Sequence, residues 1–128
     1  MINGVPAAQY LEYRDKVLPF LEKFADLSLG RATVESLEAA IGRRERQVWV
    51  INDFQALCVT SLSPESVNID FAAGIRRHEW QQELDEEMRE WARALGKKRI
   101  IAHVRPGWSK WGNTRGYKEA YREMILDI

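Results

Sequence analysis

The chain has 128 residues, 45% of them hydrophobic and 10% aromatic, and its 19 basic and 19 acidic side chains give zero formal net charge. This composition excludes a disordered or collagen-like chain, and a domain of this size buries roughly two-thirds of its unfolded surface, so it folds without a metal ion or disulfide. No stretch reaches the roughly 18 apolar residues of a membrane span, and the first residues lack a signal-peptide pattern, so we expect one cytoplasmic domain over residues 1–128.

The first part of the chain predicts two helices. Residues 8–29 place apolar side chains three or four positions apart, as one face of a helix requires. Pro19 removes a backbone donor inside this stretch, so we expect a kink or break near Leu18. Thr33 is a suitable N-cap for a second, short helix over residues 34–41, which Gly42 ends.

From residue 47 the pattern changes to strands. Runs rich in β-branched and aromatic residues lie at 47–51, 54–62 and 66–72, with turn-forming residues between them. These runs predict a meander of three antiparallel strands. The only cysteine, Cys58, lies in the second run, which excludes an intramolecular disulfide, fits a reducing compartment and predicts a buried thiol.

The second half of the chain alternates helix and strand. Apolar spacing predicts a helix from Trp80 to Leu95, residues 99–104 predict a short strand, and residues 107–116 a short helix or loop. Residues 117–128 alternate in a way that fits a last strand, although the pattern alone also allows a helix. A helix between the third and fourth strands favours a parallel crossover, so we expect three layers of class α+β or α/β.

Charge is distributed unevenly along the second half. Residues 79–90 carry six acids against one base, whereas residues 97–118 carry seven bases and no acid. The basic segment suits a phosphate-bearing ligand, or it neutralises the acidic stretch beside it. Zero net charge and an apolar strand inside the segment argue against nucleic acid. Trp108 and Trp111 lie among these bases and fit contact with a ligand or partner, whereas three tryptophans on apolar faces fit the core: Trp49, Trp80 and Trp91.

The element order, with Gly116-Tyr117-Lys118-Glu119 opening the last strand, resembles the GNAT superfamily of acyl-CoA N-acyltransferases. The phrases RQVWVI (46–51), EWARALG (90–96), RPGWSK (105–110) and RGYKE (115–119) are similar to small, mostly uncharacterised GNAT-like proteins of phages and prophages. The resemblance implies an α+β fold of three layers, α/β/α, whose mixed, mainly antiparallel sheet has a V-shaped split for acyl-CoA between the strands at 66–72 and 99–104. The first strand of that family has little room in residues 1–6, so we expect it to be absent or very short.

The resemblance also implies where acetyl-CoA would bind. In typical GNAT proteins the loop after the strand at the split carries Q/R-x-x-G-x-G/A, whose backbone N–H groups and following helix N-terminus hold the pyrophosphate. This chain has Ala72-Ala73-Gly74-Ile75-Arg76-Arg77-His78 there, with one glycine instead of two. The implied cofactor site consists of Phe71, Ala72, Gly74, Arg76 and Arg77, with both guanidinium groups on phosphate oxygens. The alternative is that both arginines are solvated or paired with Glu79 or the acids behind it.

The catalytic residues stay unassigned at this level. Many GNAT proteins use a tyrosine four residues before the glycine of the terminal Gly-Tyr motif to protonate the departing thiolate, and that position is Gly112 here. Tyr117 is expected to be a packed strand residue. An amine acceptor would need a general base, and no spacing singles out one of the four candidates: Asp70, Glu119, His78 and His103. His103 fits a structural role in an apolar strand, and Asp70 fits a solvent-facing position between two apolar neighbours.

Three functions stay open. The first is transfer of acetyl from acetyl-CoA to an unidentified amine by an enzyme of phage or prophage origin, in the host cytoplasm. The second is a GNAT fold without catalysis, as a binding or virion-associated protein with a partner surface at Trp108 and Trp111. The third is nucleic-acid contact through residues 97–118. Two histidines and one cysteine at no metal-like spacing predict no metal site. GNAT domains often pair, so a homo-oligomer is in keeping with the resemblance, but nothing in the sequence identifies an interface.

Overall fold

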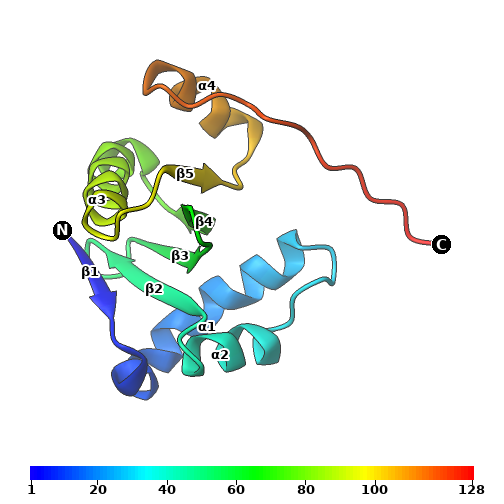
Figure 1. Cartoon of the computed structure of the whole chain (residues 1–128). Coiled ribbons are helices and arrows are strands. Elements are labelled where there is room, and N and C mark those ends of the chain that lie inside the picture. The colour runs from blue at the N-terminus through cyan, green and yellow to red at the C-terminus, as the bar shows by residue number, and fades with distance from the viewer.

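A five-stranded sheet forms the middle layer of the computed structural model, which describes residues 1–128 (Figure 1). The strands lie side by side in chain order: β1 (Ile2–Val5), β2 (Arg46–Ile51), β3 (Ala56–Leu62), β4 (Ser66–Gly74) and β5 (Arg99–Ala102). The first four strands are antiparallel, and β5 is parallel to β4. The predicted meander and parallel crossover are therefore confirmed, and the first strand is present but short.

Helices cover both faces of this sheet. They are α1 (Tyr10–Leu27), α2 (Val34–Gly42), α3 (Gln81–Ala94) and α4 (Pro106–Thr114), with short 3-10 turns η1 (Ala7–Gln9) and η2 (Arg77–Glu79). Thr33 caps α2 as predicted, because its hydroxyl accepts a bond of 3.0 Å from the backbone N–H of Ser36. Of the kink or break predicted near Leu18, the break is wrong: α1 runs through Pro19, since core packing of its turns offsets one missing hydrogen bond. None of the helices combines the length and the apolar character that a membrane span requires.

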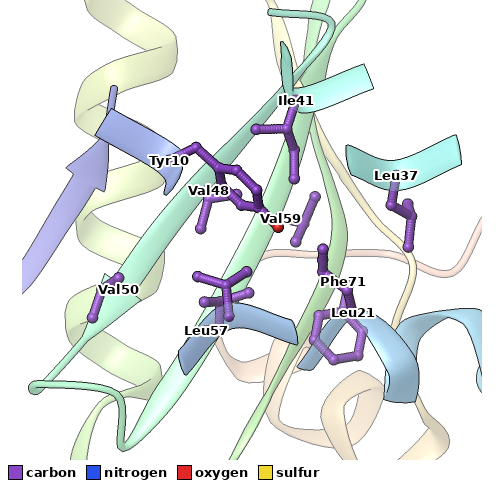
Figure 2. Close-up of a cluster of buried hydrophobic side chains, with 10 residues drawn as sticks. Tyr10, Leu21, Leu37, Ile41, Val48, Val50, Leu57, Val59 and Phe71 are labelled. Carbon is purple, nitrogen blue, oxygen red and sulfur yellow. The ribbon is translucent and has the colours of Figure 1, made fainter. Parts of the chain in front are cut away.

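One face of the sheet packs against α1 and α2. Figure 2 shows this cluster, in which Leu21 of α1 and Leu37 of α2 lie over the valines and leucine of β2 and β3, beside Phe71 of β4. Phe71 also stacks on Phe24 of α1, with ring centroids 5.1 Å apart. These side chains come from alternate positions of each strand, which is why the strands read as apolar patterns in the sequence.

The opposite face packs against α3. One face of α3, together with the residue before it, points to the sheet through Trp80, Leu84, Met88 and Ala92. These side chains contact the remaining apolar side chains of the sheet, including the fully buried Cys58. Trp49 and Trp91 pack edge-on beside them, with ring centroids 4.8 Å apart. The two clusters account for the three-layered α+β architecture that the sequence predicts.

Strand β4 contains a bulge at Asp70. Ile69 pairs with Thr60 and Phe71 pairs with Val59, so Asp70 is an extra residue in β4. Ile69 belongs to the cluster under α3, whereas Phe71, two positions later, belongs to the cluster under α1 and α2. Side chains two positions apart in a strand normally lie on the same face of the sheet. The bulge therefore turns the side chains that follow Asp70 to the face opposite the one that the regular alternation would give them.

The predicted last strand is wrong. Residues 117–128 form neither helix nor strand, and Figure 1 shows this end of the chain running away from the sheet. A strand forms only where a neighbouring strand supplies hydrogen bonds, and no strand of the chain lies beside these residues. Residues 117–128 therefore have the alternating pattern of a strand but form no strand.

Candidate functional site

Strands β4 and β5 part halfway along β4. They pair from Ser66 with Arg99 to Ile69 with Ala102, and the final contact is a bond of 3.0 Å from the His103 N–H to the Ile69 carbonyl. Residues 70–74 of β4 continue with β3 on one side and no strand on the other. We call this opening, between residues 69–74 and residues 102–103, the fork. It is the predicted V-shaped split.

Two candidate bases meet at the fork. The bulged Asp70 has a side chain only 12% exposed, and one of its carboxylate oxygens is 3.9 Å from Nδ1 of His103. The other oxygen accepts a bond of 2.9 Å from Arg46 of β2. Asp70 is thus not the solvent-facing residue that the strand pattern predicts, because the bulge redirects its side chain.

His103 is the accessible member of this group. Its side chain is 65% exposed at the end of β5, while Arg46 holds the Asp70 carboxylate and also lies over the ring of Phe24, 5.3 Å from its centroid. Imidazole is the side chain that most often acts as a general base, and this one is exposed with a carboxylate beside it. The arrangement can therefore accept a proton from a group that enters the fork.

The other two candidate bases lie elsewhere. His78 is exposed in η2, before α3, and Glu119 is exposed in the C-terminal segment, 3.6 Å from Arg122. Neither has a contact with the Asp70 group. Sequence reasoning also missed Arg46, which no local pattern connects with Asp70.

The predicted cofactor residues begin in the floor of the fork. Phe71 is buried with its ring against Phe24, so only its backbone faces the opening, and Ala72 is half-buried against the cluster under α3. Gly74, the last residue of β4, lies against the turn between β2 and β3. A Cβ atom on Gly74 would lie 2.3 Å from the Gln55 carbonyl oxygen, so the position requires glycine for packing.

The two predicted arginines occupy the loop between β4 and α3. Arg76 adopts the left-handed conformation, with φ of 53°, and its exposed guanidinium lies 3.4 Å from Glu79. Arg77 lies over the ring of Trp108 in α4, 5.2 Å from the centroid. A hydrogen bond from the Gln55 side chain, with a smaller contribution from Arg76, lowers the pKa of Glu79, so this carboxylate is ionised in the loop.

This loop nevertheless fits the diphosphate of a coenzyme. Helix α3 starts at Gln81, one residue after η2, and the first N–H groups of a helix have no acceptor within it, which suits an anion. The exposed pair of Arg76 with Glu79 is of the kind that contributes about 0–1 kcal/mol, so a phosphate group can replace the carboxylate. Two carboxylates oppose a diphosphate there, Glu79 in the loop and Glu83 in the first turn of α3.

Helix α4 closes one side of this loop through its tryptophans. Trp108 lies between Arg77 and Trp80, with ring centroids 5.7 Å apart for the two tryptophans, and Trp111 packs edge-on against Trp108 at 5.9 Å. Both are half-buried. The two tryptophans therefore contact the chain's own arginines and core, which places α4 beside the fork.

A buried carboxylate fixes the end of α4 to α3. Asp85 accepts hydrogen bonds from Tyr117 at 2.6 Å and from the Nε atoms of Arg89 and Arg115, both at 2.9 Å. Burial, and next the bond to Asp85, raise the pKa of Tyr117, so it stays a protonated donor. Tyr117 is thus packed, as predicted, although it lies in no strand, and it is not free to donate a proton in the fork. One local signal points to this group: Asp85 directly follows Leu84, an apolar position of the helix.

The only thiol takes no part in the site. Cys58 is fully buried in β3, and burial raises the pKa of its thiol above the usual range. A thiol in this state is neither a nucleophile nor a metal ligand. Nor does the chain hold three or more metal-binding side chains together.

Several solved structures have the same fold as this chain. A probable acetyltransferase has a TM-score of 0.75 at 16% identity, over 100% of this chain and 97% of that one. The ribosomal-protein-alanine N-acetyltransferase from Brucella melitensis biovar Abortus 2308 has a TM-score of 0.67 at 11% identity, over 100% and 98%. The fold is that of the GNAT acetyltransferases. AAC(6')-Iy, solved with the bisubstrate analogue CoA-S-monomethyl-acetylneamine, shares this GNAT fold with a TM-score of 0.65 at 12% identity, over 100% and 97%. No family model and no curated protein matches the sequence.

Proposed function

We propose that the chain is an N-acyltransferase that moves an acyl group, with acetyl the first choice, from acyl-CoA to an amine. The observation that carries this proposal is the fork itself, in which a parallel strand pair opens beside a partly buried Asp70 and an exposed His103. A GNAT fold that holds a linked coenzyme and amine analogue in AAC(6')-Iy supports it. The resemblance to phage and prophage proteins, and a cytoplasmic location, remain predictions.

The loop between β4 and α3 would hold the coenzyme. Arg76 and Arg77 supply guanidinium groups and α3 supplies backbone N–H groups, which together suit a diphosphate. The backbone of residues 70–74 lines the open side of β4, where polar backbone groups can orient an acyl carbonyl. Bound acyl-CoA supplies an activated thioester carbonyl next to this strand.

The Asp70 group would handle the proton of the amine. His103 takes up the proton that the nitrogen loses as its bond to the acyl carbon forms, and Asp70 stabilises the resulting imidazolium. Arg46 keeps Asp70 in place. The departing sulfur leaves as a thiolate that solvent protonates, since Gly112 stands where many GNAT proteins have a tyrosine and Tyr117 is held by Asp85.

A second candidate is a GNAT fold that binds without catalysis. Two observations favour it: Gly112 lacks any acidic proton, and Glu79 places a carboxylate in the loop that would receive the diphosphate. The acceptor class also stays open, because the similar structures are described with acceptors as different as a ribosomal protein alanine and a neamine derivative.

Calorimetry with acetyl-CoA tests the site, and release of free CoA thiol with a panel of primary amines tests the reaction. The double variant Arg76→Glu with Arg77→Glu is expected to abolish binding while leaving the fold intact. The matched control is Arg43→Glu with Arg44→Glu, which makes the same charge change in an exposed pair at the end of α2. Equal affinity in both double variants would contradict the assignment of the loop.

The same assay separates the two candidates. Binding of acetyl-CoA together with thiol release that falls at least tenfold in His103→Ala supports the transferase. Binding without thiol release for any amine supports the binding protein. No binding to the wild-type chain contradicts both uses of the loop.

A further inference from the structure

A small cavity lies outside the fork, where three segments of the chain meet. It has a volume of about 320 Å³ between the turn after β1, the end of α2 and the start of β2. Figure 1 shows the turn after β1 beside the end of α2. The volume is at the lower end of the roughly 300–1,000 Å³ that ligand pockets span, which suits a small molecule.

The charged side chains that line this cavity are both positive. They are Arg44, in the loop between α2 and β2, and Arg46, the first residue of β2, and no carboxylate lines the cavity. Arg46 already donates to Asp70. Arg44 forms no ion pair, whereas the neighbouring Arg43 donates two hydrogen bonds of 3.0 Å to Glu45. An unpaired guanidinium at a cavity without acids attracts an anion.

The backbone of Arg44 has a conformation that favours glycine. Arg44 is the second residue after α2 and has a φ of 62°, in the left-handed region. Helices commonly end with a glycine in this conformation, because a side chain there strains the backbone. Two hydrogen bonds hold it: the Arg44 N–H donates to the Ile41 carbonyl at 3.0 Å, and the Gln47 side chain donates to the Arg44 carbonyl at 3.4 Å. A strained residue that also lines a cavity points to a function for its side chain.

The rest of the lining suits a ligand that has both an acidic group and an apolar body. Val5, Pro6 and Ile41 form an apolar wall. Ala7 and Ala8 line the cavity beside this wall, and their N–H groups, at the start of η1, have no acceptor within the chain. Free N–H groups of this kind can donate to the oxygens of an anion, and the wall supplies apolar surface to bury.

We propose that this cavity is a binding site for a small organic anion, with a carboxylate or phosphate group at Arg44 and an apolar body against Val5, Pro6 and Ile41. Arg44 would donate to two oxygens of that group, which is the arrangement that suits a guanidinium. The cavity shares no residue with the loop between β4 and α3, so this anion is separate from the diphosphate of a coenzyme.

Nuclear magnetic resonance of the full, isotope-labelled chain tests the site with four probes: benzoate, phenyl phosphate, inorganic phosphate and the neutral benzamide. We expect benzoate or phenyl phosphate to shift the backbone signals of Ala7, Ala8 and Arg44 in a saturable way, and benzamide to leave them unchanged. The probe that binds more tightly identifies the acidic group. No saturable shift with either aromatic anion would overturn the proposal, and equal affinity for inorganic phosphate and phenyl phosphate would contradict the apolar part of the site.

Two substitutions at Arg44 separate binding from structure. Arg44→Gln should weaken binding of the preferred probe by about tenfold or more, whereas the matched control Arg43→Gln, which removes the neighbouring paired charge, should leave it unchanged. Arg44→Gly should abolish binding and raise Tm, because glycine relieves the left-handed strain. Equal affinity in the two glutamine variants, or a lower Tm in Arg44→Gly, would contradict a role of this arginine in binding.

The coenzyme loop supplies the last control. Arg76→Glu with Arg77→Glu should leave the binding of benzoate and phenyl phosphate unchanged. A probe whose binding is lost in that double variant binds the coenzyme loop, and the cavity proposal would then be wrong. The probes contain neither coenzyme nor thioester, so a failure of acetyl-CoA to bind would contradict only the proposed function.

Discussion

Removal of one hydroxyl group, in Tyr117→Phe, tests the link between α4 and α3. The Tyr117 hydroxyl donates to Asp85, whose side chain is 3% exposed, over 2.6 Å. A hydrogen bond to a charged group contributes about 1.5–3 kcal/mol, and the two arginines keep the carboxylate partly satisfied in the variant. The packing of Arg89 over the ring is unchanged, since the ring remains. We therefore expect the free energy of unfolding to fall by about 1.5–3 kcal/mol.

Urea unfolding followed by tryptophan fluorescence measures this loss, and a thermal scan should show a Tm lower by about 5–12 °C for a chain of this size. The matched control is Tyr121→Phe, because Tyr121 is 82% exposed and has no hydrogen-bond partner. Asp85→Asn should cost at least as much, since it leaves Arg89 without a counter-charge and Arg115 with Glu86 alone, at 3.8 Å. Equal stability of the two tyrosine variants would refute the argument that Asp85 fastens this end of the chain.

Three further predictions concern other parts of the molecule. Glu79→Gln removes a carboxylate that opposes a diphosphate, so calorimetry should show acetyl-CoA binding that is tighter by about two- to fivefold. A hydrogen bond from Arg14 lowers the pKa of Glu38 below its usual 4.5 in the folded chain. The ionised side chain therefore stabilises the fold above pH 4.5, and this stabilisation is lost as the pH falls through the lower pKa of the folded state. Glu38→Gln should accordingly make the unfolding free energy depend less on pH in the acid range. Gly74→Ala places a Cβ atom 2.3 Å from a carbonyl oxygen and should lower the unfolding free energy by about 1–3 kcal/mol, whereas Gly42→Ala, with nothing within 4 Å, should raise it by up to about 1 kcal/mol.

Each of these has a result that would contradict it. Glu90→Gln, an exposed acid farther along α3, should leave coenzyme binding unchanged, and an equal gain there would show a general charge effect. An acid limb that is the same with and without Glu38 would mean that other carboxylates set the pH dependence. A stable Gly74→Ala variant would show that the turn before β3 can move.

Most of the fold follows from local pattern. The strands β2 to β4 and the helix α3 bury one or two faces, so their apolar spacing is visible in a single sequence. Thr33 marks the start of α2 because a hydroxyl acceptor is needed there. The parallel crossover follows from a helix between two strands.

The candidate site could not be read in the same way. In the sequence Asp70 fits the regular alternation of a strand. Only the pairing of β4 with β3 shows that it is the extra residue of a β-bulge. Its partners come from β2 and from the end of β5, far away in the sequence, so no spacing rule connects them. Only tertiary structure brings Asp70, Arg46 and His103 together.

Two of the wrong predictions, the helix break at Pro19 and the last strand, have a common cause. Pro19 and the alternation of residues 117–128 are genuine local preferences, and in each case tertiary structure decides otherwise. Packing of α1 on the sheet outweighs one missing hydrogen bond, and a strand-forming sequence without a neighbouring strand stays unpaired.

The burial of Cys58 makes the chain convenient for site-directed labelling. Because its thiol is buried in β3 and its pKa is raised, maleimide and nitroxide reagents will not react with it in the folded protein. A cysteine introduced at the exposed His78 and another at Tyr121 would then be the sole reactive positions, with no need to alter the native residue. Distances between two such probes could follow the loop before α3 and the C-terminal residues as acetyl-CoA is added.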